Sequence, residues 1–237
     1  MRALAYVPPC FPLAGWEVTL RRRGGTVEYI VEDMTEALRT GRLSPGQRLV
    51  ESDLIRMLGV SRGSLREALN RLSAAGLVEI VPNRGAVVRV LTRRQVADRF
   101  EIRMCLEGLA AELAAQNLDE GDNRTRLIET LNTLSDEPNP SVERSRRDNY
   151  VLHGAIAELS GNSALIPMIR RLWLPLVMAR MRDALGSEFW RESREDHHRI
   201  VEAILARDAA GAAAAMRAHL AERCKVILAL PSEVFGE

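Results

Sequence analysis

The sequence is poor in cysteine, and it lacks long apolar runs. It holds 3 cysteines in 237 residues, Cys10, Cys105 and Cys224, which are far apart and form no CxxC pair. This spacing argues against a disulfide framework or a zinc ribbon and favours reduced thiols in a cytoplasmic protein. No apolar run approaches the ~18 residues of a membrane span, so we expect no membrane partner.

Lysine and aromatic residues are also scarce. Lys225 is the single lysine, and aromatic residues make up 4% of the chain. Alanine and leucine are abundant, which favours helices packed through small and aliphatic side chains. The net charge of +1 excludes a general polyanion binder, but residues 1–92 hold 13 arginines against 9 acidic residues. The basic excess therefore lies in the first part of the chain.

The pattern of apolar residues changes near residue 91. Residues 1–24 are expected to form a disordered leader, 25–91 a small domain, 92–231 an all-helical bundle and 232–237 a tail. In the small domain, helices are predicted over 26–39, 51–58 and 61–75, followed by a hairpin that pairs 77–81 with 86–90. In the bundle, helices are predicted over about 92–117, 119–134, 141–160, 163–185, 187–206 and 208–229. The predicted fold is mainly α.

The order helix, short helix, three-residue turn, third helix and hairpin is typical of a winged helix-turn-helix. The turn is Gly59–Val60–Ser61, and the third helix enters the major groove by its N-terminal end. Candidate DNA-binding residues occupy that end and the hairpin: Ser61, Arg62, Gly63, Ser64, Arg66, Arg84 and Gly85. Serine hydroxyls bind phosphate oxygens, and arginine grips guanine through two hydrogen bonds. The alternative is that Arg62 and Arg66 form an ordinary solvated helix face, with Glu67 and Glu36 as partners.

All four histidines lie in the predicted bundle. His153, His197 and His219 fall in separate helices beside apolar neighbours, whereas His198 is expected outside because adjacent helical residues cannot share one face. Helix bundles build metal sites from side chains of facing helices, and neutral imidazole suits zinc or nickel. Buried structural histidines are the alternative.

The first domain resembles the DNA-binding domain of the GntR family of bacterial transcription regulators. The resemblance rests on G-x-L-x-P-G from Gly41, on G-V-S-R-x-x-L-R-E-A-L from Gly59, and on the G-L-V and N-R-G of the hairpin. It implies a homodimer that binds palindromic double-stranded operator DNA, usually as a repressor. Many members have an arginine where Ser52 stands, and that arginine contacts DNA. Its absence here implies one lost contact.

The bundle is similar to the FCD ligand-binding domain of the FadR-type branch of this family. The resemblance rests on R-x-x-L-E from Arg103, N-x-x-x-H from Asn149, and the His197 and His219 motifs. It implies a divalent metal held by His153, His197, His219 and the residue at Asn149, where the family commonly has aspartate. It further implies a small carboxylate effector that pairs with Arg103.

Three alternatives stay open. Arg103 can instead form a surface ion pair with Glu107, four residues on. The regulator can be metal-independent, with a bundle that dimerises or binds another ligand. A metal-dependent hydrolase would use three histidines as zinc ligands, but the sequence has no HExxH motif and the DNA-binding domain would be unexplained. We therefore do not expect an enzyme.

Overall fold

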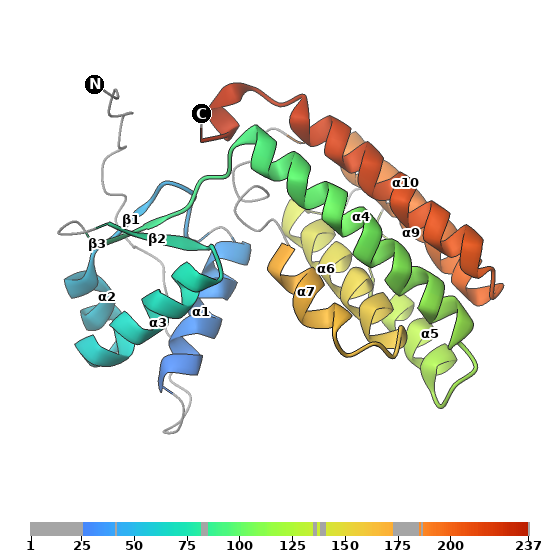
Figure 1. Ribbon diagram of the computed structural model, residues 1–237, viewed down its shortest axis with the longest axis horizontal. Helices are drawn as coiled ribbons and strands as arrows, with labels where there is room; N and C mark the ends of the chain where they lie inside the picture. The colour runs from blue at the N-terminus through green and yellow to red at the C-terminus, as the bar shows by residue number, and fades with distance from the viewer. Residues whose placement is uncertain are drawn as a thin grey trace. The chain divides into compact units, whose positions relative to one another are not determined.

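The computed structural model describes residues 26–40, 42–81, 85–134, 137, 141–172, 185 and 187–236 (Figure 1). The expectations for the leader, for Arg84 and for the second half of the predicted helix 163–185 lie outside these residues. The chain divides into two compact units, the first ending at Leu91 and the second beginning at Thr92. No helix in the described ranges is both long and apolar enough to cross a bilayer.

The first unit contains three helices and a small sheet. The helices are α1 (Thr26–Thr40), α2 (Glu51–Leu58) and α3 (Arg62–Ala74), and the strands are β1 (Arg48–Leu49), β2 (Val78–Val81) and β3 (Gly85–Val88). The sheet is antiparallel in the order β1-β3-β2. The predicted hairpin is therefore confirmed. The sequence did not predict β1, because two residues are too few to show an alternating pattern.

Local sequence signals fix the angle between α2 and α3. Gly59 has φ 63° and closes α2 through its N–H, which donates to the carbonyl of Ile55. This left-handed conformation suits glycine because it has no Cβ. The hydroxyl of Ser61 then accepts from the amide of Ser64 and caps α3. Leu65, Leu69 and Leu72 are buried on one side of α3, so its opposite side is left for solvent.

The second unit is a bundle of helices. Its described helices are α4 (Arg93–Gln116), α5 (Asn123–Thr133), α6 (Val142–Leu159), α7 (Leu165–Leu172), α9 (Ser187–Leu205) and α10 (Ala209–Leu228). Thr92 begins α4 with a full capping box to Gln95, and Asp208 caps α10. The helices predicted over 92–117, 141–160, 187–206 and 208–229 are confirmed, and α5 starts later than expected. Of the predicted helix 163–185, the described residues include only its first part, as α7.

Small residues line the packing of α4 against α10, which run side by side in Figure 1. The buried alanines are Ala110, Ala111, Ala114 and Ala115 on α4 and Ala212 and Ala213 on α10. Gly108 also belongs to this interface, since a Cβ there would lie 2.9 Å from Nη1 of Arg217. Side chains this small let the two helix axes approach closely.

Residues 232–237, expected to be a tail, begin with the short helix η1 (Ser232–Val234). Phe235 follows it and is buried, with the guanidinium carbon of Arg93 4.3 Å from its ring centroid. The residues up to Phe235 are thus packed onto the start of α4.

Candidate functional site

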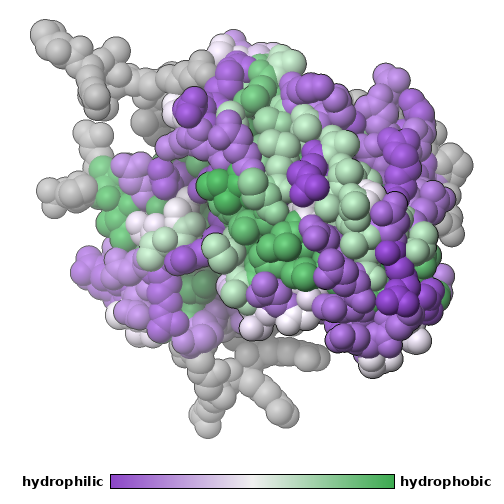
Figure 2. All heavy atoms as spheres, turned by 45° about the vertical axis from the view of Figure 1, so that its right-hand side comes forward, coloured by the Kyte–Doolittle hydropathy of each residue, from purple (hydrophilic) through white to green (hydrophobic). Residues whose placement is uncertain are grey.

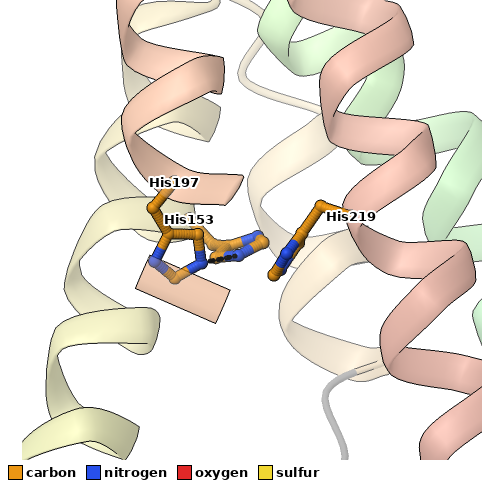
Figure 3. Close-up of side chains that lie close together, drawn as sticks. All are labelled: His153, His197 and His219. Atoms are coloured by element: carbon orange, nitrogen blue, oxygen red, sulfur yellow. Dashed lines mark hydrogen bonds between the residues drawn. The ribbon is translucent and has the colours of Figure 1, made fainter. Parts of the chain in front are cut away.

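Three histidine side chains converge in the bundle. His153 comes from α6, His197 from α9 and His219 from α10, and their rings turn toward one another in Figure 3. The Nε2 atoms of His153 and His197 lie 3.3 Å apart, and one nitrogen of each ring lies within 4.8 Å of the others. The structure thus brings together the three histidines selected from the sequence, and His198 is exposed as predicted.

Burial keeps two of these rings neutral. The pKa of His197 falls well below its usual range, first because the ring is buried and then because His219 and His153 are close. Burial likewise lowers the pKa of His219 to about 4, although the Asp196 carboxylate opposes the shift. A neutral imidazole keeps a lone pair, which metal coordination requires.

Two carboxylates orient the rings from outside. Oε2 of Glu107 lies 2.5 Å from Nδ1 of His153, and Oδ2 of Asp196 lies 3.1 Å from Nδ1 of His219. Each contact takes the Nδ1 hydrogen and leaves the Nε2 lone pair for the centre of the cluster. Carboxylate–histidine–metal arrangements of this kind are general in metalloproteins. The sequence prediction missed both residues in this role, although Glu107 stands in the R-x-x-L-E motif and Asp196 precedes His197.

Arg103 is a buried partner of Glu107, not a surface one. Its Nε lies 2.6 Å from Oε1 of Glu107, and both side chains are less than a tenth exposed. Burial alone would raise the pKa of Glu107, but Arg103 and His153 lower it to about 2. The carboxylate is therefore ionised, and one continuous chain of contacts joins Arg103, Glu107 and His153.

The geometry of the cluster fits a divalent metal. Zinc–nitrogen bonds of about 2.0–2.1 Å place two ligand nitrogens of a tetrahedron roughly 3.3–3.4 Å apart. The Nε2 atoms of His153 and His197 already lie 3.3 Å apart. Asn149 lies on α6 one turn before His153 and is partly buried. The neighbouring Asp148, about 100° round the helix from Asn149, instead pairs with Arg144 at 3.0 Å.

Three polar residues near the end of α6 and on α7 lie outside the histidine cluster. Oδ1 of Asn162 accepts from the amide of Ala164 at 3.1 Å and stabilises the turn before α7. Arg170 and Arg171 are exposed at the end of α7.

The second candidate surface is the leading end of α3. Ser61, Arg62 and Gly63 are exposed there, and the Ser61 and Ser64 hydroxyls lie 3.0 Å apart. Arg66 is also exposed, but its Nε lies 3.3 Å and 3.2 Å from the two carboxylate oxygens of Glu51. The expected partners were Glu67 and Glu36, and Glu67 instead pairs with Arg71 at 3.1 Å.

A groove of about 520 Å³ separates this end of α3 from the sheet. Its polar lining includes Arg48, Ser52, Arg66 and Asn70. Gly85 borders it with φ 86°, and a Cβ there would lie 3.0 Å from the carbonyl oxygen of Leu49. Only glycine therefore allows β3 to approach β1 at this point. Ser52 is exposed.

Residues 59–63 also match the pattern G-x-S-x-G, which is the nucleophile motif of α/β-hydrolases. In those enzymes the serine stands on a turn from a strand into a helix. Here Ser61 follows a helix, and its hydroxyl caps α3. The pattern is therefore part of the helix-turn-helix and carries no hydrolase site.

Sequence comparison assigns both units to known families. Residues 26–88 match the bacterial regulatory proteins of the gntR family, and residues 98–222 match the FCD domain. The Nta operon transcriptional regulator of Aminobacter aminovorans is 32% identical over 188 residues, covering 78% of this chain and 86% of that protein. The transcriptional repressor GlaR of Escherichia coli (strain K12) is 29% identical over 189 residues, covering 76% and 86%.

The fold of a solved relative agrees with this assignment. The structure of Escherichia coli McbR/YncC superimposes with a TM-score of 0.76 at 26% identity, covering 86% of this chain and 98% of that one. These relatives and both domains are transcription regulators, not enzymes. The chain is a DNA-binding transcription regulator of the GntR family, with a winged helix-turn-helix followed by an FCD domain.

Proposed function

We propose that the FCD domain of this regulator binds a divalent metal and a small organic acid, and that the acid controls operator affinity. The observation that carries the proposal is the convergence of His153, His197 and His219, with Nε2 atoms 3.3 Å apart for the first two. Zinc or nickel suits this set of imidazoles. The bound metal would offer an open position to a carboxylate oxygen.

The charge of the site favours an anionic effector. The three imidazoles bring no negative charge, and Asn149 adds an amide where a carboxylate would partly neutralise the metal. Two carboxylates lie behind the rings, but Glu107 is already paired with Arg103 and Asp196 with Arg199. A dication held here keeps most of its charge, and an anion compensates it. We propose that Arg103 holds Glu107 in place through their ion pair. A contact between Arg103 and the effector carboxylate would be made in addition to that pair.

The DNA-binding surface is proposed to be the exposed end of α3, with Ser61, Arg62, Gly63, Ser64 and Arg66, together with Arg84 and Gly85 of the hairpin. Helix N-terminal amides and serine hydroxyls suit phosphate, and the arginines suit guanine. Repression is proposed because GlaR, a relative across both domains, is named a repressor. Effector binding then acts through its different affinity for the DNA-competent and DNA-incompetent states.

A homodimer is proposed from the outer face of α4. Ile102 is 48% and Leu109 39% exposed, and Cys105, Leu106 and Leu113 continue this stripe at helical spacing. The opposite side of α4 is buried, so this stripe is a second apolar face of the helix. Figure 2 shows a broad apolar area bordered by hydrophilic residues on one face of the molecule. A second copy would cover such a face and present two recognition helices to a palindrome.

The metal content of purified protein tests the central proposal. Wild-type protein, after dialysis against zinc, is expected to retain about one metal per chain by mass spectrometry, and His153→Ala and His219→Ala are expected to lose it. His198→Ala is the control, because that ring is exposed and outside the cluster. Equal metal in the wild type and in both cluster variants would refute the site.

A further inference from the structure

The residues that follow α10 turn back and pack on the start of α4. α10 ends at Leu228, Pro231 precedes the short helix η1, and Phe235 follows that helix. Figure 1 draws this segment in red beside the green start of α4. Phe235 is 5% exposed. Residues 229–236, named the C-terminal strap below, therefore carry a buried aromatic anchor.

Arg93 holds the C-terminal strap at both of its ends. Its Nη1 donates to the carbonyl oxygens of Leu228 and Leu230, and its Nη2 lies 3.2 Å from the second of these oxygens. Its guanidinium carbon stacks on the ring of Phe235. The last carbonyls of a helix have no donor within the helix, and a cation suits that end of the helix dipole. One side chain of α4 thus closes α10 and holds the anchor of the strap.

The position of Arg93 does not favour α4 itself. Arg93 is the first residue of α4, where the helix dipole favours anions over cations. Its neighbour Arg94 carries the same charge but pairs with Asp98, one turn further along α4, at 2.7 Å. The interactions that favour Arg93 at this place therefore come from the end of α10 and from the strap.

The strap also contacts the linker, residues 89–92, which joins β3 to α4. The N–H of Gly236 donates to the carbonyl oxygen of Leu91 at 3.1 Å. A Cβ at Gly236 would lie 3.2 Å from the Cβ of Val90, which is closer than the ~3.5–4.0 Å at which carbon atoms pack. The absence of a side chain at this position therefore lets the strap lie directly on the backbone of the linker.

The two ends of the linker are fixed by other contacts. The N–H of Arg89 donates to the carbonyl oxygen of Leu77 at 3.0 Å in the first unit. Thr92 forms the capping box with Gln95 in the second unit. Leu91, which accepts from the strap, lies between these two fixed ends. Rotation about the middle of the linker is the motion that would reorient the DNA-binding unit, and the strap is bound at that place.

We propose that the C-terminal strap restrains the linker and thereby limits the orientations that the DNA-binding unit can adopt. A restraint that exists before binding reduces the conformational entropy that is lost on binding. The restraint uses contacts within one chain and needs neither a metal nor an effector. Its effect on DNA affinity rests on the proposed homodimer, because two recognition helices must then engage two half-sites together.

Three variants of the full-length protein open the strap in different ways. Phe235→Ala removes the anchor, and Gly236→Val places a side chain against the linker. Arg93→Lys keeps the charge but loses the fork that reaches two carbonyl oxygens. Arg94→Ala is the matched control, because Arg94 is 83% exposed and pairs with Asp98 instead of the strap.

Amide hydrogen exchange, followed by mass spectrometry, tests the restraint. After correction for intrinsic rates, the peptide 89–96 should exchange about tenfold faster in each strap variant than in the wild type. The Arg94→Ala variant should exchange like the wild type. Wild-type exchange in α1 and α6, one helix of each unit, establishes that a variant is folded. Wild-type exchange of the peptide 89–96 in all three strap variants would overturn the proposal.

A DNA-binding measurement then tests the consequence of the restraint. The probes are a palindromic duplex selected in vitro from random sequences and a duplex that holds one half of it. Phe235→Ala and Gly236→Val should reduce the preference for the palindrome about tenfold and leave affinity for the half-site unchanged, because the DNA-binding unit is intact. Faster exchange with an unchanged preference would support the restraint and refute its effect on DNA. A wild type without preference for the palindrome would contradict the homodimer, and the strap would still be judged by hydrogen exchange.

Discussion

Nδ1 of His153 lies 2.5 Å from Oε2 of Glu107, and the other oxygen of that carboxylate lies 2.6 Å from Nε of Arg103. One carboxylate thus fixes a candidate metal ligand with one oxygen and a buried cation with the other. Glu107 is 2% exposed, so water cannot take the place of either partner in this bridge. The relationship makes Glu107 the residue through which α4 acts on the cluster.

Glu107→Gln should therefore weaken zinc binding without removing a ligand. The amide keeps the shape of the side chain but no longer draws the Nδ1 proton, and loss of such outer partners typically costs about 10–100-fold in metal affinity. Competition with a chromophoric chelator measures the change. Glu101→Gln, at an exposed position of the same helix, should leave the affinity at the wild-type value. Equal affinity in both variants would remove Glu107 from the site.

Arg62→Ala and Arg66→Ala should each weaken operator binding by about 1–3 kcal/mol, the usual loss for a base-contacting arginine. Arg71 offers a matched control on the same helix, because it pairs with Glu28 and Glu67 away from the leading end of α3. Its alanine variant should bind operator like the wild type. Anisotropy titrations with operator and random DNA, at one fixed salt concentration, compare the Arg62 and Arg66 variants with the Arg71 control. A comparable loss in all three variants would mean a general charge effect.

Glu51→Gln should strengthen binding to operator and random DNA alike. The Glu51 carboxylate accepts from Nε of Arg66, and its negative charge lies where phosphates would approach. Removing that charge frees the arginine, with an expected gain of several-fold that shrinks as salt rises. Asp53→Asn, in which the lost charge pairs with Arg56 instead, should gain less. A lower affinity for DNA in Glu51→Gln would show that the pair positions Arg66 for binding.

The metal-free protein should lose stability on mild acidification. The pKa of His219 is about 4 when folded and 6.5 by ordinary value, so between these pH values the unfolded chain binds more protons. Stability therefore falls as pH falls, by about 2 kcal/mol between pH 7 and pH 5 for this one group. Urea unfolding in the presence of a chelator measures it. His219→Gln should make the profile less steep, with the part due to the buried His197 remaining, and His198→Gln should leave it unchanged. A flat wild-type profile would contradict the buried neutral ring.

The sequence predicted the local structure well because its signals are local. Gly59 and Ser61 specify a helix end and a cap from their own chemistry, and both have those roles in the structure. The histidines could be selected because imidazoles on three apolar helix faces have few uses. In each case the determining interaction lies within a few residues along the chain, so the sequence alone is enough to predict it.

The partners of charged residues could not be predicted in the same way. Arg66 pairs with Glu51, fifteen residues away, and Glu107 with His153, forty-six away. The sequence suggested Glu67 and Glu36 as partners of the α3 arginines, but the packing of α2 on α3 and of α4 on α6 decided the outcome. The burial of the Arg103–Glu107 pair likewise depends on neighbouring helices. These contacts are set by the packing of one helix on another, which spacing rules within a single helix do not describe.

The small alanine side chains packed between α4 and α10 have a consequence for the histidine cluster. Glu107 on α4 holds His153, while His219 stands on α10, so the gap between these rings depends on how closely the two helices pack. Replacing Ala111 or Ala213 by valine would force the axes apart. The distance between the ligand nitrogens therefore also depends on the small volume of the alanine side chains between α4 and α10.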